Sequence, residues 1–234
     1  MTVNRTTAYA TTSAVALPEQ PAGPARTACR DRPAPVVRDL RDRSGRSPHA
    51  LLFGPHDLVV VTGLPGSGKS TLMRRAVRGP RVDSQDTRDT WDGRLGHRLP
   101  YAVYRPLVRL AHYAGLARTL RGGDGVVVHD CGTQSWVRGW LARAARRRGG
   151  TLHLLLLDVT PDTALDGMRE RGRGVSRYAF LRHRGAAARL IRAVERGDLP
   201  PGVGSAVLLD RDAADVLRGI GFTGRSRPPA HRLA

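Results

Sequence analysis

A short stretch, VVVTGLPGSGKSTLMRR at residues 59–75, constrains the fold more than any other part of this chain. An apolar run leads into a glycine-rich segment that matches GxxxxGK[ST], and an amphipathic run follows it. Glycines let the backbone curl so that successive N–H groups point inward, and a helix that begins there adds the positive end of its dipole. The stretch therefore predicts a strand, a phosphate-binding loop and a helix in direct succession.

Lys69 in this loop is the only lysine of the chain, although the chain has 39 basic residues. A flexible ammonium reaches the β- and γ-phosphates of a nucleotide, whereas a guanidinium is planar, bulkier and differently directed. We expect Lys69 to act on the transferred phosphate, the Ser70 hydroxyl to bind Mg²⁺ and Thr71 to lie near the α-phosphate. The predicted ATP-binding residues are Gly63, Leu64, Pro65, Gly66, Ser67, Gly68, Lys69, Ser70 and Thr71.

From residue 57 onward, short apolar runs alternate with longer amphipathic segments, a pattern typical of βα units around a parallel sheet. Strands that are covered on both faces have continuous Val/Leu runs. Such runs predict strands at 57–62, 125–130, 151–159 and 205–210, with a weaker one at 80–83. Helices are expected at 69–78, 101–121, 135–148, 161–171, 177–196 and near 212–219.

The two ends of the chain lack this pattern. Residues 1–50, rich in Thr, Ala, Pro and Arg, predict a disordered leader, and residues 223–234 predict a flexible tail, which leaves one domain at 51–222. No apolar run approaches the roughly 18 residues that span a bilayer, and the N-terminus lacks the features of a secretory signal. Cys29 and Cys131 lie far apart with no metal-binding spacing around them. We expect a soluble, cytoplasmic protein with no membrane partner.

The formal net charge of +19 has two readings. A strongly basic surface favours contact with a polyanion such as nucleic acid. Nearly complete replacement of lysine by arginine, together with abundant Ala, Gly, Pro and Val, is also typical of a GC-rich coding bias. The charge alone therefore leaves a polyanionic partner and a compositional background equally open.

Polar residues that follow the weak second strand are candidates for acceptor binding. Asp83, Asp86 and Arg88 lie in VDSQDTRDTW. A carboxylate there can accept a proton from an attacking hydroxyl, and an arginine can hold an anionic part of the acceptor. The alternative is a solvated loop that caps the strand. Either carboxylate fits the role of base.

The strand at 125–130 ends in His129 and Asp130. An aspartate at a strand end beside a phosphate loop typically orients Mg²⁺ or its waters, so Asp130 is a predicted metal residue. Its alternative is a helix cap or a plain strand end. We expect His129 to be a packed or surface histidine.

An arginine-rich segment, RERGRGVS, follows the helix expected after the 151–159 strand. Arg169 and Arg173 are four residues apart, so on a continuous helix both project from one face and can clamp the transferred phosphate when a lid closes. The alternative is a solvated helix end, where basic residues suit the helix dipole.

Two tryptophans lie four residues apart in WVRGW at 136–140. This spacing is typical of one face of a packed helix. The alternative is that they, like Trp91, stack on a base or an aromatic acceptor; we leave all three out of the predicted site.

Taken together, these motifs resemble the P-loop kinase-type AAA domain group that includes polynucleotide 5′-kinases, zeta-toxin-like kinases and chloramphenicol phosphotransferase-like enzymes. The resemblance covers about residues 57–220 and rests on GLPGSGKST, the aspartate after the second strand, VVVHD and RERGRGVS. One departure concerns the acceptor side. In that group an arginine commonly follows the aspartate at three positions, whereas here Arg88 follows Asp86 at two and Asp89 occupies the third.

The resemblance implies an α/β fold: a P-loop NTPase three-layer αβα sandwich with a five-stranded parallel sheet of order 2-3-1-4-5 and an arginine lid. It further implies transfer of the ATP γ-phosphoryl group to a hydroxyl of a small molecule or a nucleic-acid end, with ATP and Mg²⁺ as cofactors. Asp86 is then the predicted base, with Asp83 as the alternative, and Arg169 and Arg173 are the lid groups. Asp83 and Arg88 are the predicted acceptor-binding residues.

A different class of function fits the same motifs. An ATP-binding regulatory or interaction protein would use nucleotide binding to move the arginine lid without phosphorylating any acceptor. The two hypotheses differ in whether an acceptor consumes ATP.

Overall fold

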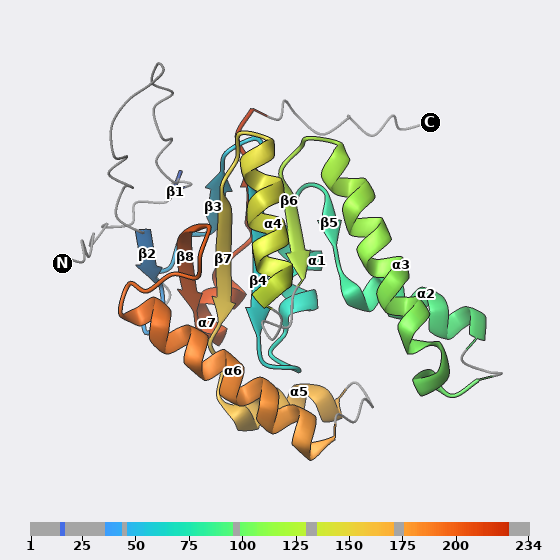
Figure 1. Cartoon of the computed structure of the whole chain (residues 1–234). Coiled ribbons are helices and arrows are strands. Elements are labelled where there is room, and N and C mark those ends of the chain that lie inside the picture. The colour runs from blue at the N-terminus through green and yellow to red at the C-terminus, as the bar shows by residue number, and fades with distance from the viewer. Residues whose placement is uncertain are drawn as a thin grey trace, which may run out of the picture.

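The computed structural model describes residues 15–16, 36–43, 46–95, 99–129, 135–170 and 176–224. Within these residues, six parallel strands form one sheet in the order β2-β8-β7-β4-β6-β5 (Figure 1). The strands are β2 (Val36–Asp39), β4 (Leu58–Gly63), β5 (Arg81–Val82), β6 (Val126–His129), β7 (Leu152–Leu157) and β8 (Val203–Leu209). The five strands from β4 to β8 have the predicted order 2-3-1-4-5, and β2 adds a sixth strand beside β8.

Helices lie on both faces of this sheet, so the predicted three-layer αβα sandwich is confirmed (Figure 1). They are α1 (Lys69–Ala76), α2 (Ser84–Leu95), α3 (Tyr101–Arg121), α4 (Ser135–Arg147), α5 (Pro161–Arg169), α6 (Arg177–Glu195) and α7 (Arg211–Val216). Among the described residues, no helix combines the length and the apolar character that a membrane crossing needs.

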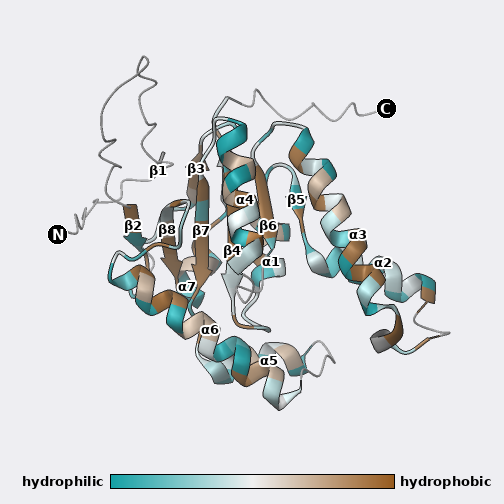
Figure 2. Ribbon diagram, in the orientation of Figure 1, coloured by the Kyte–Doolittle hydropathy of each residue, from teal (hydrophilic) through white to brown (hydrophobic). Residues whose placement is uncertain are grey.

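Alternate residues of each central strand enter two different cores. On β4, Val59 and Val61 pack with residues of α1 and α7, whereas Leu58 and Val60 pack with residues of α3, α4 and α6. Successive side chains of a strand point to opposite faces, so a strand that is covered twice must be apolar at every position. Figure 2 shows the strands as the most hydrophobic elements of the molecule. This burial explains why the central strands could be predicted from composition alone.

A second, smaller sheet joins the core on the α1 and α7 face. It has the order β1-β3-β9, with β1 at Val15–Ala16, β3 at Ala50–Phe53 and β9 at Gly219–Phe222. Leu51, Phe53 and Ile220 are buried in the same cluster as α1. The helix expected near 212–219 is α7, which ends at Val216; β9 begins at Gly219, and its alternate residues are buried.

The predicted leader at 1–50 includes residues that pair with the domain. Strand β2 pairs with β8 from Val36 to Asp39. Arg41, just after β2, binds Asp39 at 2.7 Å, Asp158 at 2.6 Å and Glu195 at 2.8 Å. The hydrogen bond to Asp39 makes the largest contribution to raising the pKa of Arg41 above its usual range. The sheet therefore includes residues that precede 51, the predicted start of the domain. Pairing with β8 and the ion pairs of Arg41 hold β2 at the edge of the sheet.

Helix α2 was not among the predicted helices, and a solvated loop was the alternative considered for its first residues. None of its residues is buried, so the helix has no apolar stripe that a period of 3.6 could reveal. It begins where the Asp83 carboxylate accepts a hydrogen bond from the Gln85 N–H at 2.9 Å. It is held against α3 by Asp92, which pairs with Arg88 and accepts a hydrogen bond from the Tyr104 hydroxyl.

Candidate active site

The glycine-rich loop connects β4 to α1 at the carboxyl edge of the main sheet, on the central strand (Figure 1). Its three glycines, Gly63, Gly66 and Gly68, have φ angles of 147°, 85° and 91°. Residues with a Cβ rarely adopt such angles. The sequence therefore places glycine at the points where the loop must turn back on itself.

Helix α5 packs directly against this loop. A Cβ atom at Gly66 would overlap with the carbonyl oxygen of Ala164, and Met168 of the same helix belongs to a small buried cluster with Leu64. Glycine is required at position 66 for this close approach as well as for its φ angle. The end of α5, where the arginine-rich segment begins, is therefore fixed close to the loop.

Helix α1 begins without a side-chain cap. Its N-cap is Gly68 in the left-handed region, whereas Thr160, Ser176 and Asp210 cap α5, α6 and α7 with their side chains. The first N–H groups of a helix need partners, and an anion can supply them. The loop thus has the features of a phosphate-binding site.

Lys69 is buried, with 5% of its surface exposed. Its ammonium donates to the carbonyl oxygens of Leu64 at 2.5 Å and Gly63 at 3.1 Å, and to the Ser67 hydroxyl at 3.3 Å. The charge therefore lies within the loop. A phosphate chain bound there would meet it at close range.

A buried carboxylate lies next to the start of α1. Asp83, directly after β5, is 3% exposed, and its Oδ1 accepts hydrogen bonds from the Gln85 N–H and from His129 Nδ1 at 2.7 Å. Burial alone raises the pKa of Asp83, but His129, the Gln85 N–H and the nearby Ser70 hydroxyl outweigh it, so this pKa lies well below its usual range. Asp83 is consequently ionised at neutral pH.

Three buried polar atoms around this carboxylate have no hydrogen-bond partner among the described residues: Asp83 Oδ2, His129 Nε2 and His112 Nδ1. The pKa of His112 is lowered by burial and then by the charge of His129, while Asp83 acts in the opposite direction, so the three residues are neighbours. Buried polar atoms normally have partners, so an unpaired group indicates a ligand or water. Within the described residues, no group of three or more His, Cys, Asp or Glu side chains is arranged to hold a metal ion.

A family model described as AAA domain matches residues 58–192, more than half of the chain. The chain belongs to the AAA domain family. The match includes the glycine-rich loop, Asp83 and His129, and it confirms the predicted membership.

Solved structures resemble the AAA domain in part. One is from the PezAT toxin–antitoxin system of Streptococcus pneumoniae, with 14% identity, a TM-score of 0.49 and coverage of 80% of this chain and 84% of that chain. Another is a gluconokinase from Sinorhizobium meliloti, with 19% identity, a TM-score of 0.38 and coverage of 70% and 92%. No curated protein matches the chain by sequence. The family assignment therefore rests on the match over 58–192.

The two candidate bases of the AAA domain have different environments. Asp86 is in the first turn of α2 with its side chain 48% exposed, and its carboxylate is 3.9 Å from Arg81. Arg88, predicted to hold the acceptor, pairs with Asp92 four residues later at 3.4 Å. Among Asp83, Asp86 and Arg88, only Asp83 is buried, and it lies beside the loop.

Some predicted residues of the AAA domain lie outside the described part of the chain. Asp130, the predicted Mg²⁺ residue, and Arg173, the second lid arginine, are among them. Arg169 is described as the last residue of α5, 77% exposed and 2.8 Å from Asp166. Thr71 is exposed on α1, whereas Ser67 and Ser70 are buried.

Sequence reasoning missed two neighbours of the loop. His129, expected to be packed or on the surface, is the buried partner of Asp83, and Ser84 Oγ also lies 3.0 Å from its Nδ1. Arg211 follows β8, and a Cβ on Gly68 would lie 3.0 Å from its Nη1. The sequence offers one signal for both residues. Each follows the apolar run of a strand, and both strands end at the carboxyl edge of the sheet, where the loop lies.

Proposed function

We propose that this AAA domain is an ATP- and Mg²⁺-dependent kinase that transfers the γ-phosphoryl group of ATP to a hydroxyl acceptor. One observation carries the proposal. Asp83 is an ionised, buried carboxylate beside the phosphate loop, and its second oxygen has no partner among the described residues. An ionised carboxylate in a fixed position, with a lone pair that no described residue occupies, can accept the proton of a hydroxyl that approaches it.

Asp83 would accept the proton of the acceptor hydroxyl through Oδ2. The acceptor oxygen then bonds to the γ-phosphorus, the bond to the bridging oxygen breaks, and ADP leaves with that oxygen. His129 would hold the carboxylate in place through Oδ1. The loop N–H groups and Lys69 would stabilise the charge on the phosphates, as in other phosphoryl transfers.

Mg²⁺ fits the chemistry of the residues at the loop. The Ser70 hydroxyl is buried at the start of α1, directly after Lys69, which is the position from which P-loop proteins offer a ligand to this ion. When bound, Mg²⁺ neutralises negative charge on the nucleotide. Asp130 remains the predicted second residue for it.

Other predicted roles stay part of this proposal. Arg169 and Arg173 are the lid arginines that would approach the transferred phosphate, and Arg88 would contact the acceptor. The acceptor is a small molecule or a nucleic-acid end, the basic surface is available to a polyanion, and we expect the reaction in the cytoplasm.

A second function is favoured by one contact. The Lys69 ammonium donates to loop carbonyls, so a bound nucleotide would redirect it toward the phosphates. Helix α5 packs on Gly66, so the same binding event would shift α5. An ATP-binding regulatory protein could use this coupling to move its arginine-rich segment with no acceptor at all.

Labelled ATP separates the two functions. We expect wild-type protein with Mg²⁺ and γ-labelled ATP to label either a pool of 5′-hydroxyl oligonucleotides or a pool of small alcohols and nucleosides. Lys69→Ala should reduce labelling by at least about 100-fold, since it removes a charge that acts on the transferred group. Nucleotide binding without label in either pool would reject the kinase and favour the regulatory protein.

A further inference from the structure

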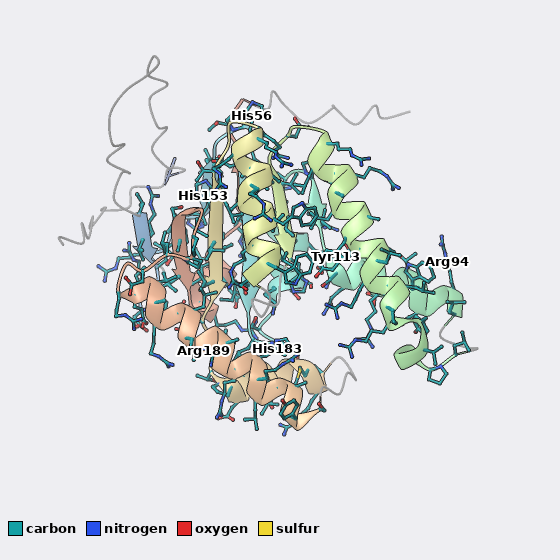
Figure 3. The ribbon with its side chains drawn as sticks, in the orientation of Figure 1. His56, Arg94, Tyr113, His153, His183 and Arg189 are labelled. Atoms are coloured by element: carbon teal, nitrogen blue, oxygen red, sulfur yellow. The ribbon has the colours of Figure 1, made fainter. Side chains whose placement is uncertain are left out.

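Two aromatic side chains meet between α3 and α4. Tyr113 projects from α3 toward α4, as Figure 3 shows, and its ring centroid is 5.3 Å from that of Trp136 in the first turn of α4. The two rings are inclined at 55°. Trp140, one turn further along α4, approaches the same tyrosine at 6.4 Å.

The two tryptophans have different surroundings. Trp140 is partly buried and packs against the core beneath α4, as the spacing in WVRGW predicts. Trp136 is 56% exposed although it contacts Tyr113. Helix packing therefore accounts for Trp140 but leaves a large indole surface of Trp136 open to solvent.

His112 connects this aromatic pair to the proposed base. Its ring lies 5.4 Å from that of Tyr113, and it is electrostatically coupled to both Asp83 and His129. Its buried Nδ1 has no hydrogen-bond partner among the described residues. An aromatic surface and unpaired polar atoms thus adjoin each other at the carboxyl edge of the sheet.

We propose that Trp136 and Tyr113 form a stacking surface for the acceptor, and that the acceptor carries its hydroxyl a few bonds from an aromatic ring, as nucleosides and aryl alcohols do. The proposal rests on the kinase function proposed above. Its physical basis is that an exposed indole gains most from a flat π-system, while the neighbouring unpaired atoms suit the polar end of the same molecule. Trp136 and Tyr113 would then determine acceptor specificity without touching the nucleotide.

Calorimetric binding to the full chain tests this proposal without requiring turnover. Saturating ADP and Mg²⁺ fill the nucleotide site, and the probes are 2-phenylethanol against 2-cyclohexylethanol, and adenosine against methyl β-ribofuranoside. We expect the aromatic member of each pair to bind about tenfold more tightly, within the range of stacking on an aromatic side chain. Trp136→Ala should remove this preference and Trp136→Phe should restore most of it.

Leu110→Ala is the matched control, because Leu110 is a large apolar residue of α3 that is 68% exposed. It should bind every probe as the wild type does. With an acceptor that is turned over, Trp136→Ala should raise the acceptor KM about tenfold and leave kcat and the ATP KM nearly unchanged. A purely structural role would instead reduce kcat or ATP binding.

Equal affinity within each probe pair, or wild-type binding by Trp136→Ala, would overturn the stacking surface. Failure to transfer label would count against the kinase alone, since binding is measured separately. A 5′-hydroxyl dinucleotide compared with adenosine identifies the source of the ring. Tighter binding of either ligand supports the stacking surface if Trp136→Ala removes it. The ligand that binds more tightly shows whether the acceptor is a nucleic-acid end or a free nucleoside.

Discussion

Two histidine–aspartate pairs lie at opposite edges of the main sheet. Asp57 precedes β4 at the amino edge and binds His153 Nε2 at 2.9 Å, while Asp83 follows β5 at the carboxyl edge and binds His129 Nδ1 at 2.7 Å. The Asp57 carboxylate also accepts hydrogen bonds from the Gly54 and Thr151 N–H groups. His153, labelled in Figure 3, uses its other nitrogen to contact Ser205 at 2.7 Å.

The two pairs differ in whether all of their polar atoms have hydrogen-bond partners. Around Asp57, both carboxylate oxygens and both ring nitrogens of the histidine have partners. Around Asp83, one carboxylate oxygen and one ring nitrogen have none among the described residues. Complete pairing is typical of a structural link between strands, whereas unpaired buried atoms indicate a site that another molecule completes. Under the proposed function, the same two residue types serve stability at one edge of the sheet and chemistry at the other.

The largest expected effect comes from changing Asp83. Asp83→Asn removes the proton acceptor, so kcat should fall about 10²- to 10⁴-fold, the usual contribution of a general base. ATP affinity should change little, because the loop is intact. Steady-state kinetics with calorimetric ATP binding measure both quantities. Asp57→Asn is the matched control and should keep kcat within about twofold at 25 °C; a similar loss in both variants would refute the division of roles.

Changing Asp57 should instead reduce stability. Asp57→Asn removes a largely buried carboxylate and leaves the His153 ring and two N–H groups poorly matched, which costs about 3 kcal/mol. For a domain of this size the midpoint of thermal unfolding should fall by about 6–12 °C. Calorimetry of the full chain checks this fall. A midpoint within about 2 °C of wild type would show that the pair contributes little to the fold.

The loss of stability in Asp57→Asn should depend on pH. Burial raises the pKa of Asp57, but the hydrogen bond and charge of His153 and the two N–H groups lower it overall. A lowered native pKa makes the stabilisation complete above the unfolded value of about 3.9. It is lost as pH falls through the native pKa. The gap in unfolding free energy between wild type and Asp57→Asn should therefore narrow below about pH 4, and a constant gap from pH 7 to pH 3 would exclude this linkage.

Burial explains what could be predicted from the sequence. The strands β4, β6, β7 and β8 are covered on both faces, so their apolar runs predicted them and the αβα class together. The phosphate loop was recognisable because its glycines and its lysine are fixed by local geometry. Helix α2 and edge strand β2 were missed because polar contacts and pairing with β8 hold them, and neither leaves a periodic pattern.

The site beyond the loop depends on contacts between distant residues. The distinction between Asp83 and Asp86 follows from His129, which is 46 residues away from Asp83 in the chain. The resemblance to known kinases left both carboxylates open for the same reason. Trp136 and Trp140 have the same sequence signature, and only the packing of α4 on the sheet separates the exposed ring of Trp136 from the partly buried ring of Trp140.

The smallest effect is expected at Asp86, the base that the sequence favoured and that the proposal for Asp83 replaces. Its carboxylate is half exposed and lies 3.9 Å from Arg81, so the ion pair is worth little in water. Asp86→Asn also removes a negative charge from the first turn of α2, which costs about 0.5 kcal/mol. Stability should therefore fall slightly and kcat should stay within about twofold of wild type, measured beside Asp83→Asn under the same conditions. If Asp86→Asn abolished turnover while Asp83→Asn retained it, Asp86 would be the base, and the unpaired oxygen of Asp83 would belong to metal or acceptor binding instead.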